Sequence, residues 1–352
     1  GKSVVIALTA KELEGNTLVL QPSKEILAQN FQKYTSYGFR AGIYSASAGV
    51  KFVDKVTFAM IGSIIAKKHL FKEFRNIIVD ECHLVNAEKG MYKEFFDTLG
   101  ESKVLGLTAT PYRLSTGFEG AMLKFITRTR PKVFNKCLYY VQNDVLFNAG
   151  HLAPLEYYHF NVINRSMLET NSTGTDFTDA SLKNYFRAIN MPAITLSYAK
   201  RLLVKRKNLL IFCSLIEEAK VVAAGIPGAA LLTGETPSAE RDRILTQFKK
   251  GSISCLVNVG VLTTGFDYPA LECVLIARST MSLALYYQIV GRVMRPYTYS
   301  DGTKKVGWVV DLGGNIAFFG KIETMKIVED ENGLMSVMNN GRHLTNVAFT
   351  KQ

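Results

Sequence analysis

Short and almost uninterrupted apolar runs alternate with longer amphipathic segments through most of the chain. In the first half these runs are TLVLQP, KVTFAMI, RNIIVDE and KVLGLTAT. Such continuous apolarity is typical of strands that are buried on both faces of a parallel sheet. After the first run, SKEILAQNFQKYTSYG places apolar residues near helical spacing and begins at Ser23, a predicted N-cap. The pattern predicts a sheet flanked by helices.

A second series of the same kind begins near residue 190. The expected strands NLLIFCS, AALLTG, SISCLVN, ECVLIA and VGWVVDL alternate with the helical segments PAITLSYAKRLLVKR, LIEEAKVVAAG, SAERDRILTQFKKG and SLALYYQIVGRVM. The polar tract LETNSTGTDFTDAS separates the two series. We therefore predict an α/β protein with tandem domains at residues 1–140 and 191–315, a linker or insertion at 141–190, and a C-terminal extension of unknown role at 316–352.

Composition narrows the class of protein. The length of 352 residues exceeds one typical domain of about 100 to 200 residues. The 42 Lys and Arg outnumber the 30 Asp and Glu, and the net charge of +12 favours a polyanionic partner. No apolar stretch approaches the roughly 20 residues that span a bilayer, and no secretory signal is recognisable, so we expect an intracellular protein. The five cysteines are widely spaced and show no zinc-site pattern.

The most informative stretch is NIIVDECHLVN, in which a buried strand ends at two adjacent carboxylates. Ligands of open α/β sheets gather at the carboxyl ends of strands. In a nucleotide hydrolase the first carboxylate would hold Mg²⁺ through water and the second would orient or deprotonate the attacking water. This assigns Asp80 to the metal and Glu81 to the water, and the alternative is a solvated acidic pair.

The next expected strand, VLGLTATPYR, ends in two hydroxyl residues, Thr108 and Thr110. Hydroxyls at a strand end can hydrogen-bond a neighbouring acidic motif and report its state to a second surface. An ordinary ST-turn is the alternative. Two polar strand ends separated by one helix, as consecutive strands would be, favour the functional interpretation.

These motifs occur in the order found in superfamily 2 helicases and translocases, which the chain resembles. DECH at 80–83 resembles the Walker B type motif, TAT at 108–110 the coupling motif, and QPSKEILAQN at 21–30 the segment after the phosphate-binding loop. LIFCS at 210–214 resembles motif IV, VLTTGFD at 261–267 motif V, and QIVGRVMRP at 288–296 motif VI. The run 233–296 is most similar to bacterial RadD-type DNA repair helicases, and restriction-enzyme motor subunits are close in pattern.

The resemblance implies two RecA-like domains that bind ATP and Mg²⁺. The opening Gly-Lys-Ser then becomes the end of a P-loop, G-x-x-x-x-G-K-[ST], whose first half would precede Gly1. Gly1 would let the backbone approach the nucleotide, and Lys2 would reach the β and γ phosphates. Ser3 would bind Mg²⁺ together with Asp80. The coupling residues implied in this half are Thr108, Thr110 and His83.

The second domain is expected to supply arginine fingers. Arg292 and Arg295 lie three residues apart on a predicted helix, so they can share one face and point at a γ-phosphate. Gln288, one turn earlier, would contact the nucleotide or the attacking water. Gly265 and Asp267 of motif V would contact the nucleotide, with an arginine as the other expected partner of Asp267.

Nucleic acid is expected to be held by backbone amides, hydroxyls and helix N-termini, in contacts that ignore sequence and weaken with salt. Each serine or threonine among the candidate residues named below could equally act as a helix cap. The candidates by motif position are Pro22, Ser23, Lys24, Gly62, Ser63, Arg113, Ser214, Thr233, Gly234 and Thr263.

The function that the resemblance implies is an ATP-dependent motor on DNA, with a role in DNA repair, recombination or replication. ATP would be hydrolysed in the interdomain cleft, in the cytoplasm of a bacterial or phage-infected cell. One alternative is an ATP-gated DNA-binding or motor subunit of a restriction or defence assembly that does not separate strands. Another is an RNA helicase, because motors that track the backbone share these motifs.

Overall fold

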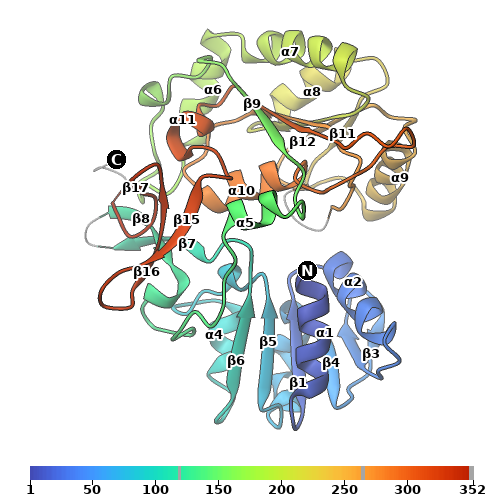
Figure 1. The fold of residues 1–352 in the computed structure, drawn as a ribbon, viewed down its shortest axis with the longest axis vertical. Coiled ribbons are helices and arrows are strands. Elements are labelled where there is room, and N and C mark those ends of the chain that lie inside the picture. Colours follow the sequence, from blue (N-terminus) through green and yellow to red (C-terminus); the bar gives the residue numbers. More distant parts are fainter. Residues whose placement is uncertain (118–119, 263–265, 349–352) are drawn as a thin grey trace. The chain divides into compact units, whose positions relative to one another are not determined.

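The computed structural model describes residues 1–117, 120–262 and 266–348, and the chain divides into two compact units (Figure 1). Unit 1 comprises residues 1–113 and 124–138, and unit 2 comprises residues 114–123 and 139–352. The boundary is crossed within the hairpin of β7 (Tyr112–Gly117) and β8 (Gly120–Phe125), and again at residue 138.

Unit 1 is built on a six-stranded sheet in the order β3-β2-β4-β1-β5-β6. All neighbouring strands are parallel except the short edge pair β2–β3. Four of the strands fall on the apolar runs that predict them, whereas β2 and β3 lie in a segment for which no strand was predicted. The strands are β1 (Thr17–Gln21), β2 (Gly42–Ser45), β3 (Val50–Lys51), β4 (Val56–Met60), β5 (Asn76–Asp80) and β6 (Lys103–Leu107).

Both faces of this sheet are covered, which explains why its strands are continuously apolar. Successive side chains of a strand point to opposite faces. Val19 therefore packs with the face covered by α1 (Lys2–Glu12) and α2 (Lys24–Thr35), while Leu18 and Leu20 pack on the other side. That other side is covered by α3 (Ile61–Ile64), the 3-10 helix η1 (Ile65–Phe71) and α4 (Met91–Phe96); two further 3-10 turns are η2 (Cys82–Leu84) and η3 (Ile126–Arg128).

Unit 2 contains a second six-stranded sheet, in the order β11-β12-β10-β13-β14-β9, and every neighbouring pair is parallel. Its strands are β9 (Leu155–His159), β10 (Leu209–Cys213), β11 (Ala230–Leu232), β12 (Cys255–Asn258), β13 (Cys273–Ala277) and β14 (Gly307–Asp311). Its helices are α5 (Asn143–Asn148), η4 (Arg165–Met167), α6 (Asp179–Ala188), α7 (Met191–Lys205), α8 (Ile216–Ala224), α9 (Ser238–Lys249), α10 (Leu283–Gly291) and α11 (Asn315–Phe319).

The segment 141–190 is part of unit 2, which corrects the expectation of a linker or insertion outside the core. Its strand β9 forms the edge of the second sheet and pairs with β14. Phe177, Leu182 and Phe186 from the same segment belong to the buried cluster around β10 and β13. The polar tract hides this role in the sequence because only isolated apolar residues, rather than a continuous run, face the core.

The C-terminal extension folds into a three-stranded antiparallel sheet of β15 (Met325–Glu329), β16 (Met335–Asn339) and β17 (Arg342–His343). The side-chain amide of Gln142 hydrogen-bonds both backbone groups of Ile327 in the edge strand β15. Gln142 Nε2 donates to Ile327 O at 2.7 Å, and Ile327 N donates to Gln142 Oε1 at 3.0 Å. One amide side chain thus takes the place of a neighbouring strand, which anchors the extension to the start of the 141–190 segment.

Cys82, Cys213, Cys255 and Cys273 are buried thiols. They pack as small apolar side chains, and burial raises the pKa of the Cys82 thiol to about 12. Across residues 1–117, 120–262 and 266–348, no helix is long and apolar enough to cross a membrane.

The assignment of residues 141–190 to the core of unit 2 predicts the effect of Phe186→Ala. Phe186 is 1% exposed, so the truncation should lower the free energy of unfolding of unit 2 by about 3–5 kcal/mol. Trp308 is the single tryptophan and lies in unit 2, so its fluorescence in urea reports on this unit. Val204→Ala is the control, because Val204 is 87% exposed. Equal effects of the two substitutions would contradict the assignment.

Candidate active site

The candidate site of unit 1 lies at the carboxyl ends of three neighbouring parallel strands, β1, β5 and β6. Asp80, the last residue of β5, is 3% exposed and has both carboxylate oxygens engaged. Its Oδ2 accepts from Asn30 Nδ2 of α2 at 2.8 Å, and its Oδ1 accepts from Glu81 N at 2.9 Å. Asn30 also donates to Gln21 Oε1 at 2.9 Å, which links the ends of β1 and β5. Asp80 is therefore buried in a fixed orientation.

Lys2, the first residue of α1, joins both carboxylates of the DECH motif. Its Nζ lies 3.3 Å from Asp80 Oδ1 and donates a hydrogen bond to Glu81 Oε1. Gly1 is the N-cap of this eleven-residue helix, and Ser3 lies half-buried in its first turn. The free amides of a helix N-terminus and the lysine charge together form an environment suited to an anion. The structure thus brings Lys2, Asp80 and Glu81 together, and Ser3 is the next residue of α1 after Lys2.

Glu81 adopts a left-handed backbone conformation, with φ 50° and ψ 49°. Residues other than glycine pay a conformational cost in this region, and such residues cluster at functional sites. The turn ends β5 sharply and starts η2 at Cys82. Glu81 therefore stays at the strand end, where Oε2 lies 3.4 Å from His83 Nδ1 and accepts from Thr108 Oγ1 at 3.5 Å.

His83 connects the acidic motif to the TAT segment that follows β6. Its Nδ1 lies 2.8 Å from Thr108 Oγ1 and 3.2 Å from Thr110 Oγ1. Thr110 N also donates to Thr108 Oγ1 at 3.0 Å. The expected contact between the threonine hydroxyls and the acidic motif is present. Burial is the main cause that lowers the pKa of His83, and the nearby charges of Lys2 and Arg113 add to it while Glu81 opposes it.

The arginines of motif VI do not share a helix face, which corrects the sequence prediction. Helix α10 starts at the N-cap Ser282 and ends at Gly291, so Arg292 is its C-cap and Arg295 lies beyond it. Pro296 disfavours helical conformation at the residue before it, which accounts for a helix that stops short of Arg295.

Both arginines instead reach the last two residues of motif V, Phe266 and Asp267. Arg292 Nε donates to Gln288 O at 3.2 Å, and its Nη1 donates to Phe266 O. Arg295 Nε lies 3.3 Å from Asp267 Oδ1, in a pair that is about half exposed on each side. Asp267 therefore has an arginine partner, as one of its two expected roles requires. Gly265 and Thr263, which were also candidates here, lie outside the described residues.

Lys305 is a residue of this region that the sequence did not single out. It is 1% exposed, and its Nζ donates to Pro269 O at 2.6 Å and to Leu271 O at 3.0 Å. Burial lowers the pKa of this amine to about 8. Lys305 thereby fixes the chain directly after Asp267. In the sequence it is indistinguishable from the exposed Lys304 beside it, so no local signal could have identified it.

Several nucleic-acid candidates have structural hydrogen bonds. Ser23 caps α2 by accepting from Ile26 N at 3.3 Å, and Ser63 Oγ accepts from Ala46 N at 3.0 Å. Thr233 Oγ1 accepts from Glu235 N at 3.2 Å, and Arg113 Nη1 donates to Val85 O. Ser214 differs, since its Oγ is buried and has no hydrogen-bond partner among the described residues. The remaining candidates are surface positions: Lys24, Gly62 and Gly234 are exposed, and Pro22 is half-buried.

The buried His83 predicts a pH dependence of the stability of unit 1. Its pKa is lower in the folded protein than the ordinary value of 6.5, so the unfolded chain takes up this proton first. The stability that unit 1 gains from a neutral His83 is fully present above about pH 6.5, and it is lost as the pH falls below this value. Hydrogen exchange of the β1 and β5 amides should report a smaller loss between pH 7.5 and 5.5 in His83→Asn. The exposed His69→Asn should behave as the unaltered protein; an equal loss in His83→Asn would contradict the assignment.

The buried Lys305 predicts that Lys305→Met destabilises unit 2. Methionine would leave the carbonyls of Pro269 and Leu271 without their donor, at a cost of about 1–3 kcal/mol in the free energy of unfolding. Urea unfolding followed by Trp308 fluorescence measures this change. Lys304→Met is the matched control and should stay within about 0.5 kcal/mol, because its side chain is exposed. Equal urea midpoints for Lys305→Met and Lys304→Met would show that the two hydrogen bonds contribute nothing to the stability of unit 2.

Two family models match the chain, one in each unit's part of the sequence. Residues 1–113 match the res subunit of type III restriction enzymes, and residues 195–297 match the helicase conserved C-terminal domain. A 51.5 kDa protein of a Lactococcus phage is 26% identical over 304 residues, covering 84% of this chain and 60% of that protein. The putative ATP-dependent helicase IRC3 of Saccharomyces cerevisiae is 26% identical over 262 residues, covering 70% of this chain and 36% of that protein. The chain thus spans about three fifths or less of these relatives' length.

Solved structures share the fold. A fragment of a putative HsdR subunit of a type I restriction enzyme from Vibrio vulnificus superposes with a TM-score of 0.61 at 22% identity, over 91% of this chain and 59% of that one. The type ISP restriction-modification enzyme LlaBIII bound to DNA superposes with a TM-score of 0.60 at 16% identity, over 89% of this chain and 25% of that one. The two matched family models, over residues 1–113 and 195–297, and the order of the motifs support a superfamily 2 helicase.

Proposed function

We propose that the protein is a motor that couples ATP hydrolysis to movement along DNA. The observation that carries the proposal is the continuous network from Lys2 through Asp80 and Glu81 to His83 and the threonines Thr108 and Thr110. A solvated acidic pair, the alternative for Asp80 and Glu81, would have neither a lysine partner nor a connection to the next strand end.

The residues present fit Mg²⁺ and ATP. Carboxylate and hydroxyl oxygens are the hard ligands that Mg²⁺ takes, usually with several waters retained. Ser3 and Asp80 would hold the ion, with Asp80 oriented by Asn30 and by Glu81 N. When bound, the ion neutralises charge on the β and γ phosphates. Among the described residues, no cluster of three or more His, Cys, Asp or Glu side chains suits a protein-only metal site, which agrees with an ion held partly by nucleotide and water.

Lys2 would change partners during the reaction cycle. Its ammonium pairs with both Asp80 and Glu81, so one positive charge is shared between two carboxylates. A γ-phosphate competes for the same ammonium, and its capture would release Glu81. The freed carboxylate can then orient the attacking water. His83 contacts Glu81 and both threonine hydroxyls, so a shift of Glu81 would reach Thr108 and Thr110 directly.

Unit 2 would supply the positive charge that stabilises the transition state. Arg292 and Arg295 are both held by the end of motif V, at Phe266 O and the Asp267 carboxylate, and Arg292 also donates to Gln288 O. Guanidinium groups aimed at a transferring phosphoryl group accelerate hydrolysis by about 10³–10⁵ where this has been measured. ATP-dependent engagement and release of this unit would move the protein along its track.

DNA is the favoured track. The net charge of +12 suits a polyanion, and two haloarchaeal relatives, 26–27% identical over 84–85% of this chain, are named putative DNA 3'-5' helicase Rad25. RNA is the second arm of the test, because S. cerevisiae Dbp5 bound to RNA shares the fold with a TM-score of 0.57.

Glu81→Gln is the variant that tests the hydrolysis site. It should bind ATP as the unaltered full-length protein does, yet lose at least about 100-fold in kcat, because the amide cannot accept the water's proton. ATP turnover is measured without nucleic acid and with single-stranded DNA, duplex DNA and RNA. Glu101→Gln, at an exposed position of unit 1, is the control that should keep full activity.

Each outcome has a separate meaning. Retained turnover in Glu81→Gln would show that another group orients the water. No stimulation of the unaltered protein by any nucleic acid would overturn the motor proposal, and stimulation by RNA alone would overturn the DNA assignment. A second candidate, a restriction-type motor that does not separate strands, is favoured by the type III restriction match over residues 1–113. Displacement of a triplex strand without unwinding of a duplex would support it.

A further inference from the structure

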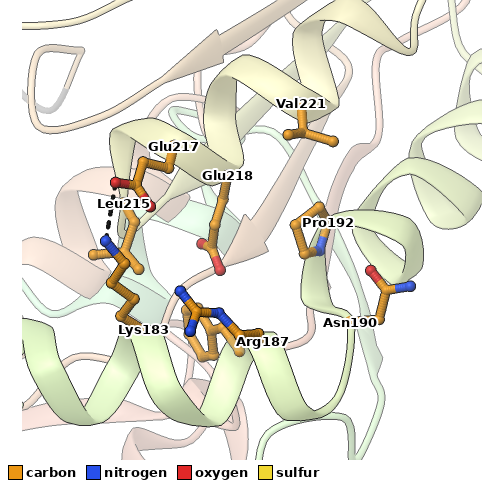
Figure 2. A pocket seen from close by; sticks show the side chains of 9 residues that line it. Lys183, Arg187, Asn190, Pro192, Leu215, Glu217, Glu218 and Val221 are labelled. Atoms are coloured by element: carbon orange, nitrogen blue, oxygen red, sulfur yellow. Dashed lines mark hydrogen bonds and ion pairs between the residues drawn. The ribbon is translucent and has the colours of Figure 1, made fainter.

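Unit 2 contains a pocket of about 230 Å³ between α6, the start of α7 and α8 (Figure 2). Lys183, Phe186 and Arg187 of α6 line one side of the pocket. Asn190 and Pro192, at the start of α7, line it next to them. The opposite wall consists of Leu215, Glu217, Glu218 and Val221, from α8 and the residue that caps it. None of these residues belongs to the candidate hydrolysis site.

Glu218 is the unusual member of this lining. It is 8% exposed, and its Oε1 is buried without a hydrogen-bond partner among the described residues. Figure 2 shows its side chain directed from α8 toward the space in front of α6. An unpaired buried carboxyl costs about 1–3 kcal/mol, so its presence calls for an explanation. Burial, with a smaller contribution from Glu217, raises the pKa of Glu218 to about 8 and keeps the group protonated at neutral pH.

The charges around Glu218 limit the kind of ligand. Lys183 Nζ lies 3.0 Å from Glu217 Oε1, so these two side chains neutralise each other. The guanidinium of Arg187 points toward Glu218 across the pocket in Figure 2. A cationic ligand would meet this guanidinium, whereas a neutral carboxyl offers both a donor and an acceptor to an uncharged polar group.

The apolar walls add a shape requirement. Phe186, Pro192, Leu215 and Val221 present hydrocarbon surface beside the one carboxyl and the one guanidinium. A nucleotide combines the matching features: a flat base with adjacent donors and acceptors on its edge, and a phosphate that pairs with arginine. Apolar and aromatic side chains contact base faces without regard to sequence.

The pocket also lies where the proposed track would pass. Leu215 follows Ser214, the motif IV residue after the carboxyl end of β10, and Ser214 Oγ is also buried with no hydrogen-bond partner among the described residues. We propose that the pocket between α6 and α8 receives one unstacked base of the bound nucleic-acid strand, with Glu218 hydrogen-bonding the base edge and Arg187 binding its phosphate. This inference rests on the proposed function.

The test compares a single-stranded oligonucleotide with the same oligonucleotide made abasic in its central half, using fluorescence anisotropy on the full-length protein. Base contacts of this kind are worth about 10-fold in affinity, so the unaltered protein should bind the abasic strand about 10-fold more weakly. Glu218→Leu should bind both strands equally. Glu218→Gln keeps a donor and an acceptor and should retain the difference. Glu240→Gln, at an exposed position of α9 outside the pocket lining, is the control.

Loss of folding is separated from loss of binding by the stability of the variants. Glu218→Leu removes an unpaired buried polar group, so its urea midpoint by Trp308 fluorescence should be equal to or higher than that of the unaltered protein. The inference is overturned if the unaltered protein binds both strands equally, or if Glu218→Leu still discriminates between them. Failure of the unaltered protein to bind any nucleic acid would instead refute the proposed function itself.

Discussion

Parallel pairing of β1, β5 and β6 is the constraint on which the candidate site of unit 1 depends. Parallel neighbours end at the same edge, so Gln21, Asp80 and the TAT segment meet although they are far apart in the chain. Covering both faces of the sheet with helices buries these strand ends. The burial makes Asp80 dependent on Asn30 and Lys2 and lowers the pKa of His83.

The polar groups of this edge form one connected network rather than separate pairs. Lys2 forms ion pairs with two carboxylates, and His83 joins Glu81 to both threonines. A change at any one member alters the partners of the others, which is the property that coupling of hydrolysis to movement requires. In unit 2, backbone carbonyls hold the charged side chains in place. Phe266 O accepts a hydrogen bond from Arg292, and the carbonyls of Pro269 and Leu271 accept hydrogen bonds from Lys305.

Unit 2 keeps polar groups unsatisfied at its own strand edge. Ser214 Oγ and Glu218 Oε1 lie close together in the sequence, both are buried, and neither has a partner among the described residues. Stability alone would favour apolar side chains at such positions. Retaining them is consistent with a surface adapted to a ligand, since binding sites commonly sacrifice stability for function.

The sequence by itself determined most of the strands and helices, the two-unit α/β plan and the identity of the acidic, threonine and arginine motifs. Continuous apolar runs and helical periodicity carry that information locally. Only the tertiary structure decided that β9 and α6 belong to unit 2, that the arginines lie at and beyond the end of α10, and that Lys305 and Glu218 are buried. The physical reason is that burial and hydrogen-bond partners depend on segments distant in sequence, so Lys304 and Lys305, or Glu217 and Glu218, are equivalent until the chain folds.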